Sequence, residues 1–250
     1  NTTVTRELYP DLGELFMLHP QYKMHIPTGR VSTTPTCQNW PVIGIANMRE
    51  LGIVPRGYRF VGADFEQIEL RLYAVIADDQ VVLEAFHKGL DVHTLNYATL
   101  RARNPSDMDE VMRIYHETVA LKKRGDEGDK KAKNDVKAWR TLAKRFVYLI
   151  CYGGETDRLF ATMSTDRDKA TGDLLFKGLT PQQVSIMYNN WHTVHPWTIQ
   201  WQEREVAHAK QHGWIQAILD GGKRHFPGGL NKRNAAPNAR IQGCLTRDHR

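Results

Sequence analysis

The sequence predicts an α+β fold that is mostly helical. Apolar residues recur at helical spacing in two segments, residues 67–77 and residues 139–152. Residues 58–65 have the character of a strand, and residues 214–226 have the pattern of a hairpin that turns at Asp220-Gly221-Gly222. Together these patterns combine several helices with short antiparallel pairing.

The first part of the chain leads to a carboxylate at the end of a strand. Residues 1–56 are mixed in character, with a turn expected at Thr28-Gly29-Arg30. The strand predicted over residues 58–65 is followed directly by the helix over 67–77. Asp64 is therefore expected at a strand-to-helix junction, where a carboxylate is exposed at the end of a sheet.

Most of the remaining chain is expected to be helical. A helix is predicted over residues 81–90, and the helix over 139–152 ends at Gly153-Gly154, a pair suited to a helix C-terminus. Residues 181–213 are helical again, with a break at Pro196.

Charge and composition indicate a globular, basic protein. The chain has 250 residues, 41% of them hydrophobic, which allows one large domain or two small ones with a sizeable core. Its net charge of +6 is compatible with a nucleic-acid partner. Residues 121–138 are dense in Lys, Asp and Glu with few apolar positions, and they are predicted to form a solvated, mobile segment.

Several classes of protein are disfavoured. No apolar run approaches the roughly 20 residues that a membrane span needs. Cys37, Cys151 and Cys244 are far apart and have no zinc-site spacing, so a reduced, cytoplasmic protein is expected. The chain begins at Asn1 without an initiating Met or a recognisable signal peptide, and a longer parent chain is expected.

One helix carries a stripe suited to a nucleotide. Arg140, Lys144, Tyr148 and Tyr152 are four residues apart, so they follow one gently wrapping face with about 6 Å of rise per step. The two cations match the span of a triphosphate, and the two rings offer flat faces for a sugar and a base. The alternative is an ordinary amphipathic helix with a basic face.

Asp64 is a candidate magnesium ligand. Nucleotidyl transfer uses two divalent ions about 4 Å apart that are held by carboxylates, and Mg²⁺ prefers oxygen ligands. The alternative is that Asp64 only caps the following helix, with Glu69 and Arg71 on a solvated helix face.

Taken together, these segments resemble the family A DNA polymerases. Ala63 to Arg71 resembles motif A of that family, and Arg140 to Gly153 resembles its motif B, the O helix of the fingers. Further segments resemble the family and occur in the same order as in its members. These segments are Thr28 to Ser32 with Gln38 to Pro41, Gly89 to Thr94, Leu219 to Arg224, and Asn238 to Gly243.

The resemblance implies a role for each of these residues in binding magnesium and nucleotide. Asp64 would bind two Mg²⁺ ions, assisted by the Phe65 carbonyl. The implied nucleotide-binding residues are Gln67, Glu69, His93, Arg140, Lys144, Tyr148 and Tyr152. Among them, Glu69 with Tyr152 would exclude a ribose 2′-hydroxyl, Lys144 would also be a general acid, and the Tyr148 hydroxyl would favour acceptance of dideoxynucleotides.

Other implied positions would contact duplex DNA, and they are Arg30, Gln38, Asn39, Asn238 and Gln242. Minor-groove contacts of this kind check pairing shape without reading sequence. Three residues depart from the family pattern: Glu66 replaces a small residue, Thr141 a frequent Arg, and Arg240 a usual Pro.

The resemblance also implies a division of the chain within the right-hand shape of a polymerase. Residues 1–76 would belong to an incomplete antiparallel palm sheet, residues 77–205 to helical fingers with the O helix at 139–153, and residues 206–243 to a hairpin that returns toward the palm. No His-Asp-Glu motif C with the second catalytic Asp is present, so this chain is expected to be an incomplete fragment that is inactive alone.

The last seven residues do not resemble the family A polymerases. Cys244 to Arg250 is similar to the first residues of an intein, in which Cys244 would take the acyl group of Gly243 and begin protein splicing. The alternative is a truncated or frameshifted tail.

The expected function is template-directed DNA synthesis from dNTPs on primer-template DNA, in the cytoplasm of a bacterium or of a phage-infected host. A missing C-terminal polymerase portion, joined by splicing, would be a further partner. The alternatives are a single-subunit RNA polymerase, which Glu69 disfavours, and a non-catalytic DNA-binding fragment that would bind DNA with strong salt dependence.

Overall fold

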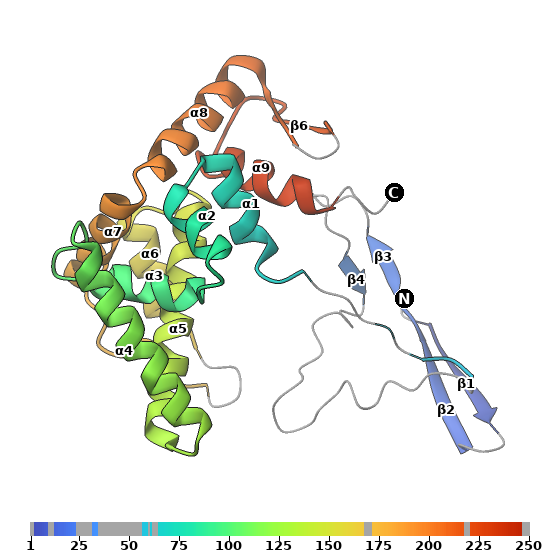
Figure 1. Ribbon diagram of the computed structural model, residues 1–250. Coiled ribbons are helices and arrows are strands. Elements are labelled where there is room, and N and C mark those ends of the chain that lie inside the picture. The colour runs from blue at the N-terminus through green and yellow to red at the C-terminus, as the bar shows by residue number, and fades with distance from the viewer. Residues whose placement is uncertain are drawn as a thin grey trace.

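The chain forms a helical body and three small antiparallel pairs of strands. The computed structural model describes residues 3–9, 13–23, 32–34, 57–59, 61, 65–167, 172–217 and 221–246. Within these residues, β1 (Thr3–Tyr9) pairs with β2 (Gly13–His19), β3 (Gln21–Lys23) with β4 (Ser32–Thr34), and β5 (Trp214–Gln216) with β6 (Lys223–His225). The α+β class predicted from the sequence is confirmed. The first two pairs lie apart from the helices (Figure 1).

Nine helices are described in this part of the chain. They are α1 (Ile68–Ala77), α2 (Gln80–His87), α3 (Val92–Arg101), α4 (Met108–Asp126), α5 (Lys130–Cys151), α6 (Thr156–Ser164), α7 (Pro181–Val194), α8 (Trp197–His212) and α9 (Ala235–Thr246). The helices expected over 67–77, 81–90 and 181–213 are present, and Pro196 separates α7 from α8. The hairpin predicted over residues 214–226 is β5–β6.

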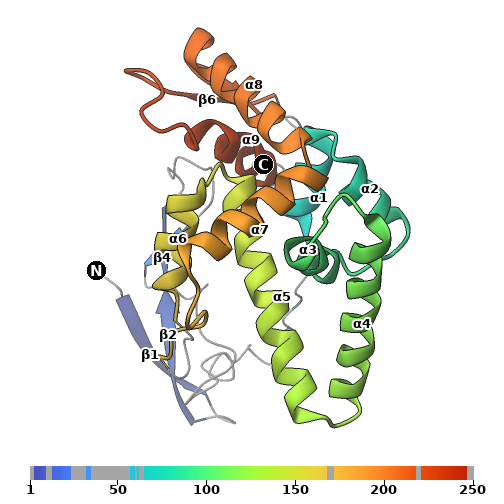
Figure 2. The same ribbon diagram turned by 90° about the vertical axis from the view of Figure 1, so that its left-hand side faces the viewer.

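The buried centre of the body is α3. Every residue from Val92 to Leu100 is buried, because α4, α5 and α7 all pack against this helix. Figure 2 shows α4 and α5 running side by side, and α7 packs against α3 and α6. The placement of α3 brings its first turn against the middle of α5, where the predicted nucleotide stripe lies.

Short side-chain caps begin the central helices. Asp79, Asp91, Asp107 and Asp129 each accept a hydrogen bond from a backbone N–H in the first turn of the helix that follows. Such caps satisfy amide groups that have no partner within the helix, typically stabilising it by about 1 kcal/mol. The caps fix where α2, α3, α4 and α5 begin.

The end of α5 is also sharply defined. Gly153 has a φ of 76°, and its N–H donates to the Ile150 carbonyl while the Gly154 N–H donates to the Leu149 carbonyl, each at 2.8 Å. These are the two bonds of a Schellman motif, in which glycine adopts the left-handed conformation at low energy. The helix end predicted from Gly153-Gly154 is confirmed.

Two sequence predictions are wrong. Residues 121–138 are helical, because they form the end of α4 and the first turns of α5, joined by a short turn that the Asp129 cap closes. Their few apolar residues suffice because each helix buries only one face, with Val136 and Ala132 turned inward. The strand expected over residues 58–65 is the second error.

Within residues 58–65 the structure describes Tyr58, Arg59, Val61 and Phe65, and none of them lies in a strand. Tyr58, Val61 and Phe65 are 72%, 93% and 72% exposed. A strand needs a neighbour to satisfy its backbone groups, and no described segment pairs with these residues.

A buried polar cluster joins the two ends of the helical body. The Tyr73 hydroxyl donates to Asp79 at 2.8 Å, and His195 Nδ1 lies 2.8 Å from the same carboxylate. Thr198 Oγ1 is 2.5 Å from the Tyr73 hydroxyl. Since the single Tyr73 proton is used by Asp79, Thr198 is the donor to Tyr73. This Asp79 cluster ties α1 and the start of α2 to the junction between α7 and α8.

Candidate nucleotide-binding site

The stripe predicted on α5 is continuous in space. The Lys144 ammonium lies 5.9 Å from the centroid of the Tyr148 ring, and the rings of Tyr148 and Tyr152 are 6.5 Å apart. His93, on α3, faces the same stripe with its ring 6.4 Å from that of Tyr148. The structure therefore brings together five of the predicted residues, since Arg140 begins the same face.

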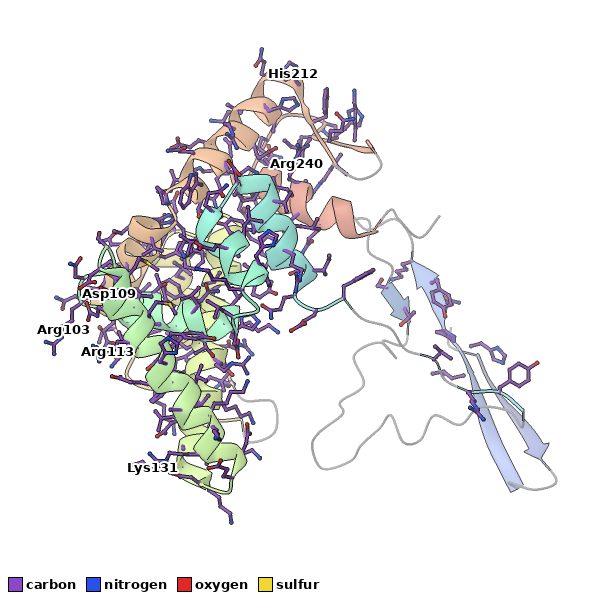
Figure 3. The ribbon with its side chains drawn as sticks, viewed as in Figure 1. Arg103, Asp109, Arg113, Lys131, His212 and Arg240 are labelled. Carbon is purple, nitrogen blue, oxygen red and sulfur yellow. The ribbon has the colours of Figure 1, made fainter. Side chains whose placement is uncertain are left out.

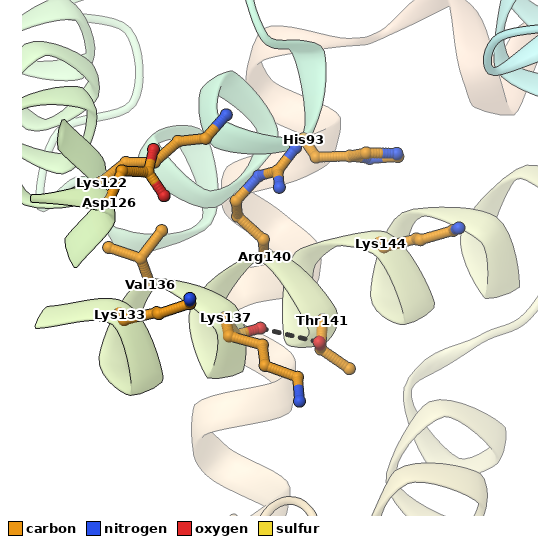
Figure 4. A pocket seen from close by; sticks show the side chains of 9 residues that line it. All are labelled: His93, Lys122, Asp126, Lys133, Val136, Lys137, Arg140, Thr141 and Lys144. Atoms are coloured by element: carbon orange, nitrogen blue, oxygen red, sulfur yellow. Dashed lines mark hydrogen bonds between the residues drawn. The ribbon is translucent and has the colours of Figure 1, made fainter. Parts of the chain in front are cut away.

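These cations line a pocket. It has a volume of about 400 Å³ and lies between α5, the first turn of α3 and the end of α4. Its lining residues are His93, Lys122, Asp126, Lys133, Val136, Lys137, Arg140, Thr141 and Lys144 (Figure 4). Such a set, with five cationic side chains and one carboxylate, suits an anion with several charges.

Asp91 holds one of these cations in place. Arg140 Nη2 lies 2.8 Å from Asp91 Oδ2 and 3.0 Å from Oδ1, so one guanidinium nitrogen contacts both carboxylate oxygens. Lys122 Nζ is 3.3 Å from the same carboxylate. Burial alone would raise the pKa of Asp91, but its bonds to Arg140 and the nearby positive charges lower it, so the carboxylate stays ionised. Arg140 is thereby oriented along the pocket.

His93 is neutral at pH 7. Burial and the nearby charges of Lys144 and Arg140 disfavour the imidazolium and lower the pKa of His93 to about 4, although Asp91 opposes this. Its Nδ1 is buried and makes no hydrogen bond within the described residues. A neutral imidazole of this kind can donate one hydrogen bond to a phosphate oxygen without adding charge.

Glu69 lies beside the two tyrosines of the stripe. Glu69, Tyr148 and Tyr152 line one narrow crevice together with Leu70, Cys151 and Ile241. Burial, with the nearby charge of Glu69, raises the pKa of Tyr148 to about 12, so its hydroxyl stays protonated. The carboxylate on α1 and the two tyrosines on α5 thus meet although 79 to 83 residues separate them in sequence.

Gln67 marks the sharp start of α1. It has a left-handed conformation, with φ 52° and ψ 33°, which is uncommon for a residue other than glycine. Its carbonyl accepts hydrogen bonds from the Leu70 and Arg71 amides, each at 3.0 Å. Gln67 occupies the N-cap position of α1, and Asp64, the capping residue of the alternative interpretation, lies outside the described residues.

The predicted magnesium site is only partly visible. Asp64, like Arg30, Gln38 and Asn39, lies outside the described residues, and Phe65 is described but exposed. The described residues contain no group of three or more His, Cys, Asp or Glu side chains that could hold a metal ion.

The predicted DNA contacts near the end of the chain lie on α9. Asn238 and Gln242 are one turn apart and half-buried. Between them, Arg240 contacts the Gln216 carbonyl on β5, and its Nε lies 3.5 Å from a Glu205 carboxylate oxygen on α8. In the stick view, Arg240 lies where α9 passes under the β5–β6 hairpin (Figure 3). Arg240, which replaces a usual Pro, therefore anchors α9.

Helix α9 continues through Gly243 and Cys244 to Thr246, so the expected splice junction falls inside a helix. Splicing at Cys244 remains a prediction.

Sequence reasoning missed one half of the pocket. Lys122, Lys133 and Lys137 line it but lie in the segment that was expected to be mobile. The spacing was a usable signal, because Lys133 and Lys137 precede Arg140 and Lys144 at nearly the same helical step. Asp91, the partner of Arg140, could be found only from the packing of α3 on α5.

The chain is similar to known DNA polymerases. Residues 10–122 match the model of DNA polymerase family A. DNA polymerase I of Chloroflexus aurantiacus is 26% identical over 238 residues, which is 90% of this chain and 21% of that protein. DNA polymerase I of Deinococcus radiodurans is 36% identical over 98 residues, covering 38% of this chain and 10% of that protein.

This chain is similar to the family A DNA polymerases. The fold is shared with the solved polymerase domain of Pol1 from M. smegmatis, in complex with DNA primer-template and dNTP, with a TM-score of 0.61 and 22% identity over 96% of this chain and 36% of that one. The chain spans about a fifth of the length of family A relatives such as those from C. aurantiacus (21%) and Pseudomonas aeruginosa (20%). None of the helices within the described residues combines the length and the hydropathy that a membrane-spanning segment requires.

Proposed function

We propose that this chain forms the fingers and an adjoining part of the palm of a DNA polymerase, and that the α5 pocket binds the triphosphate of an incoming dNTP. The observation that supports this most directly is the continuous face of Arg140, Lys144, Tyr148 and Tyr152, with His93 opposite. One end of this face is positively charged and the other end is aromatic. The face is therefore complementary to a nucleotide, whose phosphates are negative and whose sugar can lie against a ring.

Each residue has a distinct task in this proposal. Arg140, oriented by Asp91, contacts one phosphate through its guanidinium, and Lys144 contacts the next as a point charge. His93 donates a hydrogen bond as a neutral ring. In the transfer step the primer 3′-hydroxyl loses its proton to water and its oxygen bonds to the α-phosphorus, while the bond from that phosphorus to the leaving pyrophosphate oxygen breaks. The Lys144 ammonium gives its proton to this leaving oxygen.

The sugar would lie against the crevice of Glu69, Tyr148 and Tyr152. A 2′-hydroxyl would enter space that Glu69 and Tyr152 fill, so a deoxyribose is preferred. The Tyr148 hydroxyl, which remains protonated, replaces the hydrogen bonding of an absent 3′-hydroxyl, so dideoxynucleotides are accepted. This arrangement disfavours an RNA polymerase.

Asp64 and the Phe65 carbonyl are the residues proposed to hold Mg²⁺, with Gln67 shaping the turn behind them. Bound divalent ions activate the primer hydroxyl and neutralise the leaving group. A second carboxylate would come from a C-terminal portion, so we expect this chain alone to be inactive. Arg30, Gln38, Asn39, Asn238 and Gln242 are proposed to contact the primer-template duplex, and the enzyme to act in the cytoplasm of a bacterium or phage-infected cell.

Joining to that C-terminal portion by splicing at Cys244 is a further part of the proposal. It requires α9 to open at Gly243, because the helix runs through the junction. Mass spectrometry of the product of the longer reading frame would test it. A spliced product lacking an internal segment supports splicing, and an unspliced product of full mass overturns it.

Nucleotide binding by this chain provides the first test of the function. We expect dATP to bind more tightly than ATP in calorimetry, and Lys144→Ala to weaken dATP by about 10- to 100-fold, since one charge-assisted hydrogen bond contributes about 1.5–3 kcal/mol. Lys123→Ala, on the same helix pair but outside the pocket, is the control. Preference for ATP, or equal losses in both variants, would overturn the proposal.

A second test separates the enzyme from a non-catalytic DNA-binding fragment. Primer extension by this chain alone should be undetectable and should appear when a polymerase C-terminal palm portion is added. Salt-dependent binding of primer-template DNA, with no extension under any complementation, would support the binding fragment instead.

A further inference from the structure

The pocket on α5 is longer than one triphosphate. Lys133, Lys137 and Lys144 lie on the pocket face, and 11 residues of helix give about 16 Å of rise between the first and the last. Lys133 lies about 10 Å below Arg140 by the same rise. A triphosphate held by Arg140 and Lys144, which are about 6 Å apart along the axis, does not reach that far.

This distal end has its own walls. Lys122 and Asp126 come from α4, and Val136 forms the floor between the lysines (Figure 4). The two helices approach closely here, because a Cβ on Gly125 would lie 2.8 Å from the Cα and N of Lys133. Arg124 and Asp129, 2.8 Å apart, close the turn. The distal end is therefore a built part of the fold.

Positive charge is in excess at this end. Within the described residues Lys133 and Lys137 make no ion pair, whereas Lys122 shares Asp91 with Arg140. Asp126 is the only carboxylate in the lining. No aromatic ring lines this half, so it offers charge to phosphate groups without a surface on which a base could stack.

We propose that Lys122, Lys133 and Lys137 form a second phosphate-binding subsite, separate from the Arg140–Lys144 end and able to be occupied at the same time. Its ligand is a phosphate anion without base recognition, either inorganic pyrophosphate or a phosphate of a single-stranded nucleic acid. Binding of the pyrophosphate product at this subsite before its release rests on the proposed function, but phosphate binding itself does not.

The test is calorimetric titration of this chain with inorganic pyrophosphate, alone and with saturating dATP, and repeated with Mg²⁺. We expect pyrophosphate to bind in both cases. The double variant Lys133→Ala/Lys137→Ala should weaken pyrophosphate at least about tenfold and change dATP binding less than about threefold, since its charges lie outside the triphosphate span. The matched control is Lys123→Ala/Lys131→Ala, which removes the same charge from the same helix pair outside the pocket. Lys131 lies at its tip (Figure 3).

The outcomes of these titrations identify the ligand and decide whether the subsite exists. If an oligothymidylate competes with pyrophosphate and is weakened by the same variant, the subsite takes a nucleic-acid phosphate; if it does not compete, the ligand is the inorganic anion. Mutually exclusive binding of pyrophosphate and dATP, or equal weakening in the control variant, would overturn the subsite. Failure of dATP to bind while pyrophosphate still depends on Lys133 and Lys137 would reject the proposed nucleotide site and leave the subsite standing.

Discussion

The α5 pocket and the buried Asp79 cluster use charge in opposite ways. In the pocket, Lys133, Lys137 and Lys144 make no ion pair within the described residues, and the cations outnumber the carboxylates. In the Asp79 cluster, one carboxylate accepts from Tyr73, faces His195 and caps α2 through the Val82 amide. Uncompensated charge is tolerated at the surface, where water solvates it, and is strongly unfavourable when buried.

This contrast separates the charges that stabilise the fold from those that are available to bind a ligand. Asp79 and His195 are 0% and 1% exposed, so each depends on the other. Burial tends to raise the pKa of Asp79, but the charge and hydrogen bond of His195 lower it overall. The stability from this carboxylate is thus present above its unfolded pKa of 3.8 and is lost only as the pH falls through the lower, folded pKa.

The largest expected effect is on the Asp79 cluster. His195→Phe keeps the stacking on Trp191 but leaves the Asp79 carboxylate buried without its imidazole partner. We expect it to lower the free energy of unfolding by about 3 kcal/mol or more, measured by urea denaturation.

The matched comparison is the double variant Asp79→Asn/His195→Phe. The asparagine side chain removes the buried charge and keeps an oxygen for the Val82 amide. The double variant should therefore be more stable than His195→Phe alone. A loss in the double variant equal to the sum of the losses measured for Asp79→Asn and for His195→Phe would contradict a direct coupling of the two side chains.

A smaller effect is expected where α4 meets α5. Gly125→Ala gains about 1 kcal/mol of helix propensity but places a Cβ 2.8 Å from the Lys133 backbone, and such overpacking costs about 1–3 kcal/mol. We expect a net loss of up to about 2 kcal/mol in thermal or urea unfolding, together with weaker pyrophosphate binding. A more stable variant would show that the helices do not approach this closely.

The sequence predicted the elements whose periodicity is strong. Ile68, Leu72 and Ile76 identified α1, and Gly153-Gly154 identified the end of α5. Residues 121–138 were mispredicted because dense charge was taken as a sign of solvation. In the structure, Val136 and Ala132 are buried on a narrow face of α5. So few apolar residues do not stand out against the many charged residues when the segment is judged by composition.

The candidate site was predictable along a helix but not between helices. The four-residue spacing of Arg140, Lys144, Tyr148 and Tyr152 is a property of α5 alone, and the structure confirms that they share a face. The pairing of Arg140 with Asp91 spans 49 residues and depends on how α3 packs on α5. No local pattern contains that information.

The pKa of His93 reports the burial of its ring together with the positive charge of the pocket. NMR titration of this histidine should give a midpoint of about 4. Lys144→Ala removes a positive neighbour and should raise the midpoint by less than about one unit, which corresponds to 1.4 kcal/mol. A midpoint near the ordinary 6.5 in the unmodified chain would show that His93 is not buried among cations.

The same shift affects stability with a definite sign. Because the folded pKa of His93 is about 4 and the unfolded value about 6.5, the unfolded chain binds more protons between these limits. Stability should therefore fall as the pH is lowered from about 6.5 to about 4, and burial of His192, with a pKa also lowered to about 4, adds to the slope. His93→Gln should flatten part of it.

The smallest expected effect separates the two regions most clearly. Lys137→Ala removes an exposed pocket cation that makes no ion pair within the described residues, and alanine favours a helix. We expect the free energy of unfolding to change by less than about 0.5 kcal/mol, as for surface substitutions in general. Added pyrophosphate should then stabilise the unmodified chain in thermal unfolding more than it stabilises this variant, because a ligand that binds only the folded state raises stability according to its affinity. A loss of stability comparable to that of His195→Phe would mean that Lys137 serves the fold, as the Asp79 cluster does, and not a ligand.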